Sequence, residues 1–288
     1  MEELNKVRRD LRKKYIIGII YIITILIVLI ITTKNIVIML GSIFLNNFII
    51  IVLTSKLSNK YSSLYKREFV LKSLKSKFTD LFFRIDSGIS INIIETIGMM
   101  YRGDIYRTED YISGKYKDIK FEQSDINIES YNSSEEKYRT AFKGRWMIFN
   151  FDRELKYKIQ IFQKGFSNLN VKKIEKLFKK VQVDSSSFNK KFNVYVQNEN
   201  EKIYIILPFL MEKIEKISET SKCKVMFCFI DDKIHIVLDN NKDMFKPVSV
   251  FRKINEEEII KEISAELDII TQVIDEIYSE QYLFNNDI

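Results

Sequence analysis

The sequence predicts an α+β protein: an N-terminal two-helix transmembrane hairpin, then a cytosolic domain of mostly antiparallel strands with a C-terminal amphipathic helix. Two apolar stretches, Tyr15–Thr33 and Ile36–Leu53, are each about long enough to cross a ~30 Å hydrocarbon core. Residues 107–164 are rich in aromatic and β-branched side chains, which favour strands. Near the C-terminus, apolar residues recur at helical spacing: Ile259, Ile263, Leu267, Ile270, Ile274 and Ile277.

These patterns divide the chain into four parts. Residues 1–14 form a basic cytoplasmic N-terminus, and residues 15–54 form the transmembrane hairpin. Residues 55–86 are expected to form an amphipathic juxtamembrane helix, because apolar side chains recur at helical spacing up to Ile85. Residues 87–288 form the cytosolic α+β domain, with a subdomain boundary expected near 165–184. Within that domain, the polar segment Glu129–Lys137 predicts an exposed loop.

Basic residues flank the hairpin on both sides, and only Lys34 lies in its turn. Since Lys and Arg are retained on the cytoplasmic side, we expect a multi-pass protein of a bacterial cell membrane with both termini cytoplasmic. The same side chains are placed to contact anionic lipid headgroups. They are Arg8, Arg9, Arg12, Lys13, Lys14, Lys56, Lys60, Lys66 and Arg67.

Three polar residues lie within the spans: Thr24, Asn46 and Asn47. An unsatisfied amide inside a bilayer is costly, so the asparagines need hydrogen-bond partners. One interpretation is a bond within the hairpin, and the other is contact with another membrane subunit. Gly41 is the small residue expected to permit close approach of the two helices.

The distribution of charge argues against nucleic-acid binding. The chain carries a net charge of +7, yet residues 1–77 hold 14 basic and 4 acidic residues, which leaves the remainder slightly acidic. The basic excess is therefore juxtamembrane, and the globular part lacks the basic surface that a nucleic-acid binder needs.

Recognisable catalytic motifs are absent from the sequence. It has no Gly-rich phosphate loop and no Gly-x-Ser-x-Gly elbow. Its one histidine, His235, alternates with isoleucines and is expected to point away from the core. Cys223 and Cys228 are too few and too poorly spaced for a metal or redox site. We therefore assign no catalytic, cofactor-binding or metal-binding residue.

Carboxylates are the remaining option for chemistry. Asp104, Glu109 and Asp110 cluster near Arg102 and Arg107, and Asp231 and Asp232 lie together at a predicted turn. Paired carboxylates can act as acid and base or hold Mg²⁺. Surface charge explains both clusters without a function, and that is the interpretation we favour.

Several segments resemble blocks of a bacterial family, domain of unknown function 3137. These are residues 109–114 (EDYISG), 141–146 (AFKGRW) and 181–213, followed by Phe245 before Pro247. The resemblance spans nearly the whole chain and implies a membrane-anchored cytosolic domain without an established activity. It also implies a LemA-like membrane protein as a partner.

The expected function is that of a non-enzymatic, membrane-tethered scaffold or adaptor that binds protein partners at the inner face of a bacterial membrane. It would contact the lipid bilayer and its anionic headgroups, need no cofactor and bind no nucleic acid. The Ile259–Ile277 stripe is expected to pack in the domain core; the alternatives are pairing with the helix at 64–85 or with a second copy in a homo-oligomer. The alternative is an enzyme or ligand sensor that acts on a lipid-derived or envelope-associated substrate through a carboxylate site.

Overall fold

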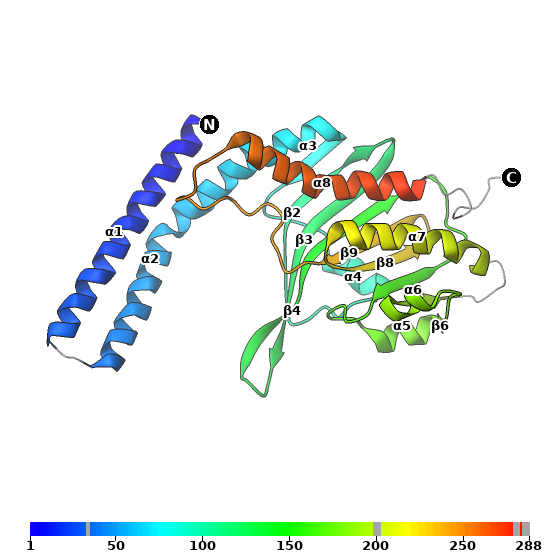
Figure 1. Ribbon diagram of the computed structural model, residues 1–288, viewed down its shortest axis with the longest axis horizontal. Helices are drawn as coiled ribbons and strands as arrows, with labels where there is room; N and C mark the ends of the chain where they lie inside the picture. Colours follow the sequence, from blue (N-terminus) through cyan, green and yellow to red (C-terminus); the bar gives the residue numbers. More distant parts are fainter. Residues whose placement is uncertain (33–34, 198–202, 279–282, 284–288) are drawn as a thin grey trace. The chain divides into compact units, whose positions relative to one another are not determined.

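The computed structural model describes residues 1–32, 35–197, 203–278 and 283 (Figure 1). By internal contacts the chain forms two compact units. Residues 1–73 and 245–263 form the anchor unit, and residues 74–244 and 264–288 form the sheet unit. Lys34, the expected basic residue of the hairpin turn, lies outside the described residues.

The anchor unit is built on two long helices, α1 (Glu2–Thr32) and α2 (Ile36–Tyr65). Asn35 begins α2, because its side-chain oxygen accepts a hydrogen bond from the Val37 N–H at 3.0 Å. The close contact between the helices is at Gly18, where an added Cβ would lie 2.6 Å from Ile50 Cδ1. Gly41 has open space around it. The expectation that Gly41 permits the close approach is therefore wrong.

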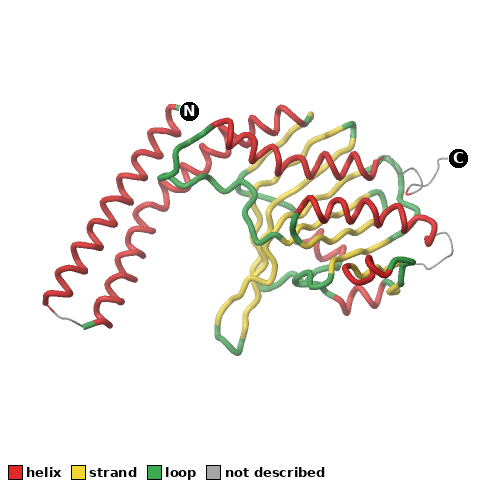
Figure 2. Tube along the Cα trace, viewed as in Figure 1, coloured by secondary structure: helices red, strands yellow, loops and turns green. Residues whose placement is uncertain are grey.

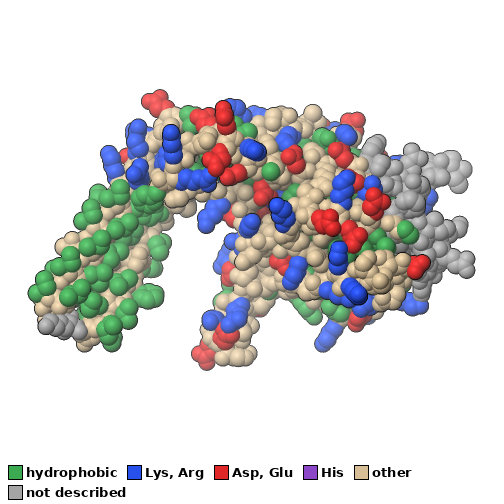
Figure 3. Space-filling view, in the orientation of Figure 1, with side chains coloured by type: hydrophobic (Ala, Val, Ile, Leu, Met, Phe, Trp, Pro, Cys, Tyr) green, Lys and Arg blue, Asp and Glu red, His purple; other side chains and the backbone are tan. Residues whose placement is uncertain are grey.

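The apolar side chains of these helices face outward. In the most apolar 18-residue window of α1 no residue is buried, and in that of α2 only 6% are. Figure 3 shows green side chains along both helices, with Lys and Arg side chains gathered at the end that carries the N-terminus. Both helices are long and apolar enough to cross a membrane.

The helix that follows α2 is shorter than the sequence predicts. A π-helical turn, η1 (Lys66–Val70), leads into α3 (Leu71–Lys77), and β1 (Thr79–Arg84) follows. The expected helix over 55–86 thus ends at Lys77. Residues 79–84 pair with β2 instead, so cross-strand hydrogen bonds override their helical spacing.

The sheet unit contains one nine-stranded sheet in the order β1-β2-β3-β4-β9-β8-β5-β7-β6, and every strand pair is antiparallel. This confirms the predicted α+β class. One sheet spans the segment 165–184, where a subdomain boundary was expected, because β5 and β6 both pair with β7. The further strands are β2 (Ile105–Tyr116), β3 (Ile119–Asn132), β4 (Lys137–Asn150), β5 (Ile159–Gln163), β6 (Lys179–Val181), β7 (Phe192–Val196), β8 (Lys224–Ile230) and β9 (Lys233–Asp239).

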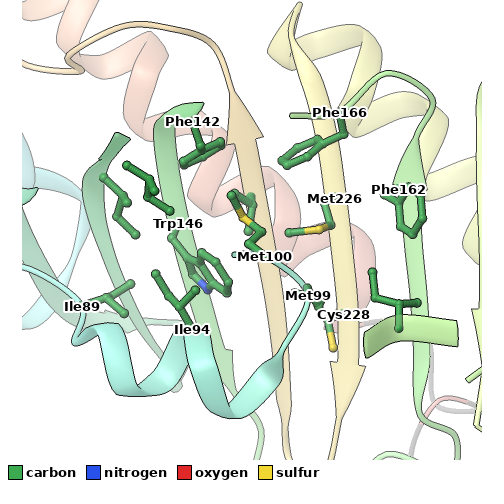
Figure 4. Close-up of a cluster of buried hydrophobic side chains, with 14 of the residues drawn as sticks. Ile89, Ile94, Met99, Met100, Phe142, Trp146, Phe162, Phe166, Met226 and Cys228 are labelled. Atoms are coloured by element: carbon green, nitrogen blue, oxygen red, sulfur yellow. The ribbon is translucent and has the colours of Figure 1, made fainter. Parts of the chain in front are cut away.

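Helices cover both faces of this sheet (Figures 1 and 4). On one face, α4 (Ile91–Ile97) and α5 (Val171–Leu177) pack on a buried apolar cluster around Trp146. Over the other lie α7 (Ile203–Ser221) and residues 264–278 of α8 (Glu256–Tyr278), while α6 (Ser186–Lys191) precedes β7. The predicted apolar stripe of α8 is buried, at most 5% exposed from Ile259 to Ile277. It is core, which leaves no exposed seam for a partner helix.

Beyond the sheet, β3 and β4 continue as a two-stranded ribbon (Figure 2). β2 pairs with β3 only as far as Glu129, and β9 pairs with β4 only over Arg145–Asn150. The tip pairs Tyr131 with Tyr138, whose rings lie 5.3 Å apart and edge to face. The exposed loop expected at Glu129–Lys137 is confined to a turn at residues 133–136, and the residues on either side of it are strand, because aromatic cross-strand pairing stabilises a polar ribbon.

Candidate functional site

The predicted membrane-surface residues at the base of the hairpin fall into three groups. Seven are exposed: Arg9, Arg12, Lys13, Lys14, Lys56, Lys60 and Arg67. Arg8 is half-buried and donates from Nε to the Val250 carbonyl oxygen at 3.2 Å, which holds the loop before α8 against α1. Lys66 is 2% exposed, because it begins a π-turn whose Phe69 and Val70 are also buried. The expectation that Lys66 faces lipid headgroups is wrong.

The polar residues of the spans bond to their own helices. Thr24 Oγ1 donates to the Ile20 carbonyl at 2.9 Å, and the Nδ2 atoms of Asn46 and Asn47 donate to carbonyls one turn earlier at 2.8 and 2.9 Å. Asn46 is buried against α1, whereas Asn47 and Thr24 are exposed. Among the described residues, neither asparagine bonds across to α1. Because these amide N–H groups donate to backbone carbonyls, placing them within a bilayer does not leave an unsatisfied hydrogen-bond donor.

In the sheet unit, a β-bulge brings carboxylates together. The register between β2 and β3 shifts between Glu109 and Ile112, and Asp110 adopts a φ of 57°. The Asp110 N–H donates to the Ile85 carbonyl at 3.0 Å instead of to β3. A bulge re-aims a side chain, and here it turns the Asp110 carboxylate toward Asp125 of β3.

Asp243, from the loop after β9, completes the cluster. One carboxylate oxygen from each of Asp110, Asp125 and Asp243 lies within 4.8 Å of the others. The loop is held in place because the Asn241 N–H donates to the Lys143 carbonyl at 2.9 Å and the Met244 N–H donates to Asp125 Oδ2 at 2.5 Å. We name these three residues the aspartate cluster.

Burial dominates the electrostatics of Asp125. Its side chain is 7% exposed, and desolvation raises the pKa of Asp125 to about 6. The guanidinium of Arg145, its cross-strand neighbour on β4, and the Met244 N–H oppose this pKa shift, while the negative charges of Asp243 and Glu109 add to it. Asp125 is therefore easier to protonate than an aspartate in water.

A pocket of about 300 Å³ opens beside the cluster. Its lining mixes acidic and basic side chains, which suits a charged or polar occupant better than an apolar one. The lining residues are Arg107, Thr108, Glu109, Asp125, Ile126, Asn127, Lys143, Lys242 and Asp243.

Of the two carboxylate groups picked out by the sequence, the first is divided in the structure and the second stays together at a turn, as expected. Asp110 joins the cluster and Glu109 lines its pocket, but Asp104 accepts a hydrogen bond from the Tyr131 N–H at 2.7 Å. Asp231 and Asp232 form ion pairs with Lys158 and Lys233 at the β8–β9 turn. Asp125 and Asp243 were missed, since no local pattern links residues that only strand pairing brings together.

His235 is buried, at 1% exposure, so the expectation that it points away from the core is wrong. Its Nδ1 accepts a hydrogen bond from Trp146 Nε1 at 3.1 Å, and burial lowers the pKa of His235 to about 3. A neutral histidine bonded to a core tryptophan has a structural role. Cys228 is also fully buried, and desolvation raises the pKa of its thiol to about 12, which makes it inert.

Comparison with protein families agrees with the resemblance found in the sequence. Residues 140–278 match the model of DUF3137, "Protein of unknown function". The match runs from β4 to the end of α8, so it includes Arg145 and Asp243 and ends short of the anchor helices. The predicted family resemblance is confirmed over this segment.

Comparisons with curated proteins and with solved structures do not assign a function. No curated protein matches the chain. One solved structure that aligns with it is the crystal structure of the mycobacterial trehalose monomycolate transport factor A, TtfA. That alignment has 8% identity and a TM-score of 0.36, and it covers 78% of this chain and 98% of the other. At that similarity it carries no argument about function.

Proposed function

We propose that this protein is a membrane-tethered adaptor, anchored by α1 and α2, whose sheet unit binds a protein partner at the inner face of a bacterial membrane. Two helices with outward-facing apolar sides support the tether. The exposed basic residues at their base support an orientation with both termini cytoplasmic and contact with anionic headgroups.

The tip of the β3–β4 ribbon is the observation that carries the adaptor proposal. Tyr131 and Tyr138 are 50% and 52% exposed, although they form an ordered aromatic pair. Tyrosine is enriched in protein interfaces because it offers a large, rigid and amphipathic contact area. The flanking Lys137, Arg139 and Glu135 form ion pairs that would make a polar rim. A LemA-like membrane protein is the partner implied by the family resemblance.

The test is copurification of the full-length protein, tagged at its C-terminus, after gentle detergent extraction. We expect one partner at near-stoichiometric amount with the natural chain. The double variant Tyr131→Ser, Tyr138→Ser should lose at least nine-tenths of that partner.

The matched control is Tyr101→Ser, which removes a tyrosine that is 47% exposed outside the ribbon. It should keep the partner. A partner that stays with the double variant would contradict binding through the tip, and a clean preparation of the natural chain would contradict the adaptor proposal.

Orientation is tested separately by labelling single cysteines with an impermeant reagent in intact cells and in inverted vesicles. Cysteine placed at Lys13 or Lys56 should react only in inverted vesicles, because both flank the spans on the proposed cytoplasmic side. Labelling of either position in intact cells would overturn the proposed topology.

A second candidate function is that of an enzyme or ligand sensor that acts through a carboxylate site. The aspartate cluster beside the 300 Å³ pocket favours it, because convergent polar groups and a perturbed carboxyl pKa are typical of functional sites. A thermal-shift screen of the full chain with nucleotides and lipid headgroups tests it. Absence of any shift would count against it, since a bound ligand stabilises the folded state by mass action.

A further inference from the structure

A groove of about 490 Å³ lies within the anchor unit, between the two long helices and the segment that precedes α8. Its lining comes from α1 between residues 11 and 19, from α2 between residues 58 and 62, and from residues 246–251. Figure 1 shows the last of these as part of the orange loop before α8. We name this feature the interfacial groove.

Hydrogen bonds to both helices hold residues 246–251 in place. Arg8 of α1 donates from Nε to the Val250 carbonyl oxygen at 3.2 Å. The Tyr61 hydroxyl of α2 donates to the Val248 carbonyl oxygen at 3.0 Å. Because the backbone of this segment is bonded to α1 and to α2, the groove is built into the anchor unit.

The position of the groove along α1 gives its depth in a bilayer. Tyr15 is the first residue of the apolar stretch of α1, and its ring centroid lies 6.3 Å from that of Phe251. Ile19, one turn further along, is 49% exposed and belongs to the outward-facing apolar surface of the span. With α1 across a membrane, the groove lies where lipid headgroups meet hydrocarbon, the depth at which interfacial aromatic residues are enriched.

The charge of the groove is positive. Lys246 lines it and is exposed, and within the described part of the chain no acidic side chain lines it. The guanidinium carbon of Arg12 lies 5.9 Å from the centre of the Phe251 ring, so a second cation stands at the groove. Phe251 itself is 48% exposed. The groove thus combines an apolar surface continuous with the span and two cationic side chains, which suits an amphiphile with a negative head.

We propose that the interfacial groove binds one anionic phospholipid of the bilayer, with its phosphate beside Lys246 and Arg12 and an acyl chain along Ile19. Long cationic side chains lay their apolar stems on lipid and keep the charge at the level of the headgroups, as this arrangement requires. The proposal rests on the membrane tether of the proposed function and adds to it a defined lipid site.

The experiment measures quenching of tryptophan emission by brominated lipids in the full-length chain, reconstituted into phosphatidylcholine vesicles. Phe251→Trp places a fluorophore at the groove. Trp146 is 0% exposed and gives a constant background, which the natural chain measures. Brominated phosphatidylglycerol and brominated phosphatidylcholine are titrated in separate samples. We expect the anionic lipid to reach half-maximal quenching at a mole fraction at least about fivefold lower, the preference that one basic residue confers at an anionic surface.

A matched pair of lysine variants separates the groove from the general basic charge of the hairpin. Lys246→Gln, made in the Phe251→Trp chain, should reduce the preference for the anionic lipid about fivefold. Lys13→Gln, which removes an exposed lysine of α1 that does not line the groove, should keep most of it. An equal loss in the two variants would assign the preference to diffuse charge and overturn the site.

Phe44→Trp separates the lipid site from the tether, because Phe44 is 80% exposed in the middle of the second span. This chain should be quenched by both brominated lipids to the same degree. Quenching of Phe44→Trp without quenching of Phe251→Trp would overturn the lipid site and leave the tether standing. Equal quenching of Phe251→Trp by the two lipids would also overturn the site, and no quenching of either chain would overturn site and tether together.

Discussion

In the apolar segments of α1 and α2 most isoleucines, leucines and phenylalanines are exposed, whereas in the nine-stranded sheet most of the same residue types are buried. Phe44 of α2 is 80% exposed, and Phe142 of β4 is 1% exposed and stacks on Phe166 with ring centroids 6.0 Å apart. The polar groups show the reverse arrangement. The asparagines of the hairpin donate within their own helix, while the sheet unit gathers carboxylates from three separate segments, two of them buried. Residue type alone therefore does not define a protein interior, because the surrounding medium decides whether an apolar side chain is stable when exposed.

The largest difference in stability should appear when one phenylalanine in each region is replaced by alanine. Phe142→Ala should lower the free energy of unfolding of the sheet unit by about 3–5 kcal/mol, because it leaves a cavity in the buried cluster (Figure 4). Phe44→Ala should leave it unchanged. The measurement is urea unfolding followed by the fluorescence of Trp146, the single tryptophan. An equal loss of unfolding free energy in both variants would contradict the proposed difference between the two regions.

The stability of the sheet unit should depend on pH through the buried carboxyl group of Asp125. The pKa of Asp125 is raised to about 6 in the folded protein, so its contribution to stability is present below pH 4 and is lost as pH rises through 6. The difference amounts to about 3 kcal/mol, at about 1.4 kcal/mol per pKa unit.

Asp125→Asn removes this titration. In EDTA, the stability of the variant relative to the natural chain should therefore be greater at pH 7 than at pH 4. Urea unfolding at the two pH values measures the difference. A pH-independent difference would show that Asp125 keeps an ordinary pKa.

Gly18 and Gly41 should differ in their effect on the hairpin, because only Gly18 lies at the contact between α1 and α2. Gly18→Leu should destabilise the pairing of α1 and α2 by about 1–3 kcal/mol, because the new side chain meets Ile50. Gly41→Leu should have little effect, since nothing lies within 4 Å of an added Cβ. The measurement is fluorescence energy transfer between one dye on α1 and one on α2 during a titration with SDS. The mole fraction of SDS at which the transfer falls to half reports the stability of the helix pair. A larger effect at Gly41 would identify a contact with another membrane subunit.

The smallest effect is expected at Asn47. Its side chain is exposed, and its Nδ2 atom already donates to the Ile43 carbonyl. Asn47→Leu should therefore change hairpin stability by less than about 1 kcal/mol in the same SDS assay. Dissociation of an oligomer in mild detergent on this substitution would support the alternative, that Asn47 contacts another membrane subunit.

Much of the fold was predictable because its signals are local. The two spans are continuous apolar runs, the strands of residues 107–164 carry aromatic and β-branched residues, and the helix after Asn255 has an N-cap followed by regular apolar spacing. The errors arose where tertiary contacts compete with local pattern. Residues 79–84 have helical spacing but pair with β2, and the polar ribbon tip is ordered by its two tyrosines.

The anchor helices, the α+β class, the buried stripe of α8 and the family resemblance could all be predicted, because each depends on periodicity or composition within one segment. Three features could not be predicted, because they depend on contacts between segments that are distant in the sequence. They are the burial of Lys66 and His235, the helix contact at Gly18, and the proximity of Asp110, Asp125 and Asp243. The aspartates come from a bulge, a strand and a distant loop. Their proximity depends on the register of β2, β3 and β4 and on the pairing of β9 with β4, which places the loop after β9 beside β3. Strand register is set by long-range pairing, which no short window of sequence contains.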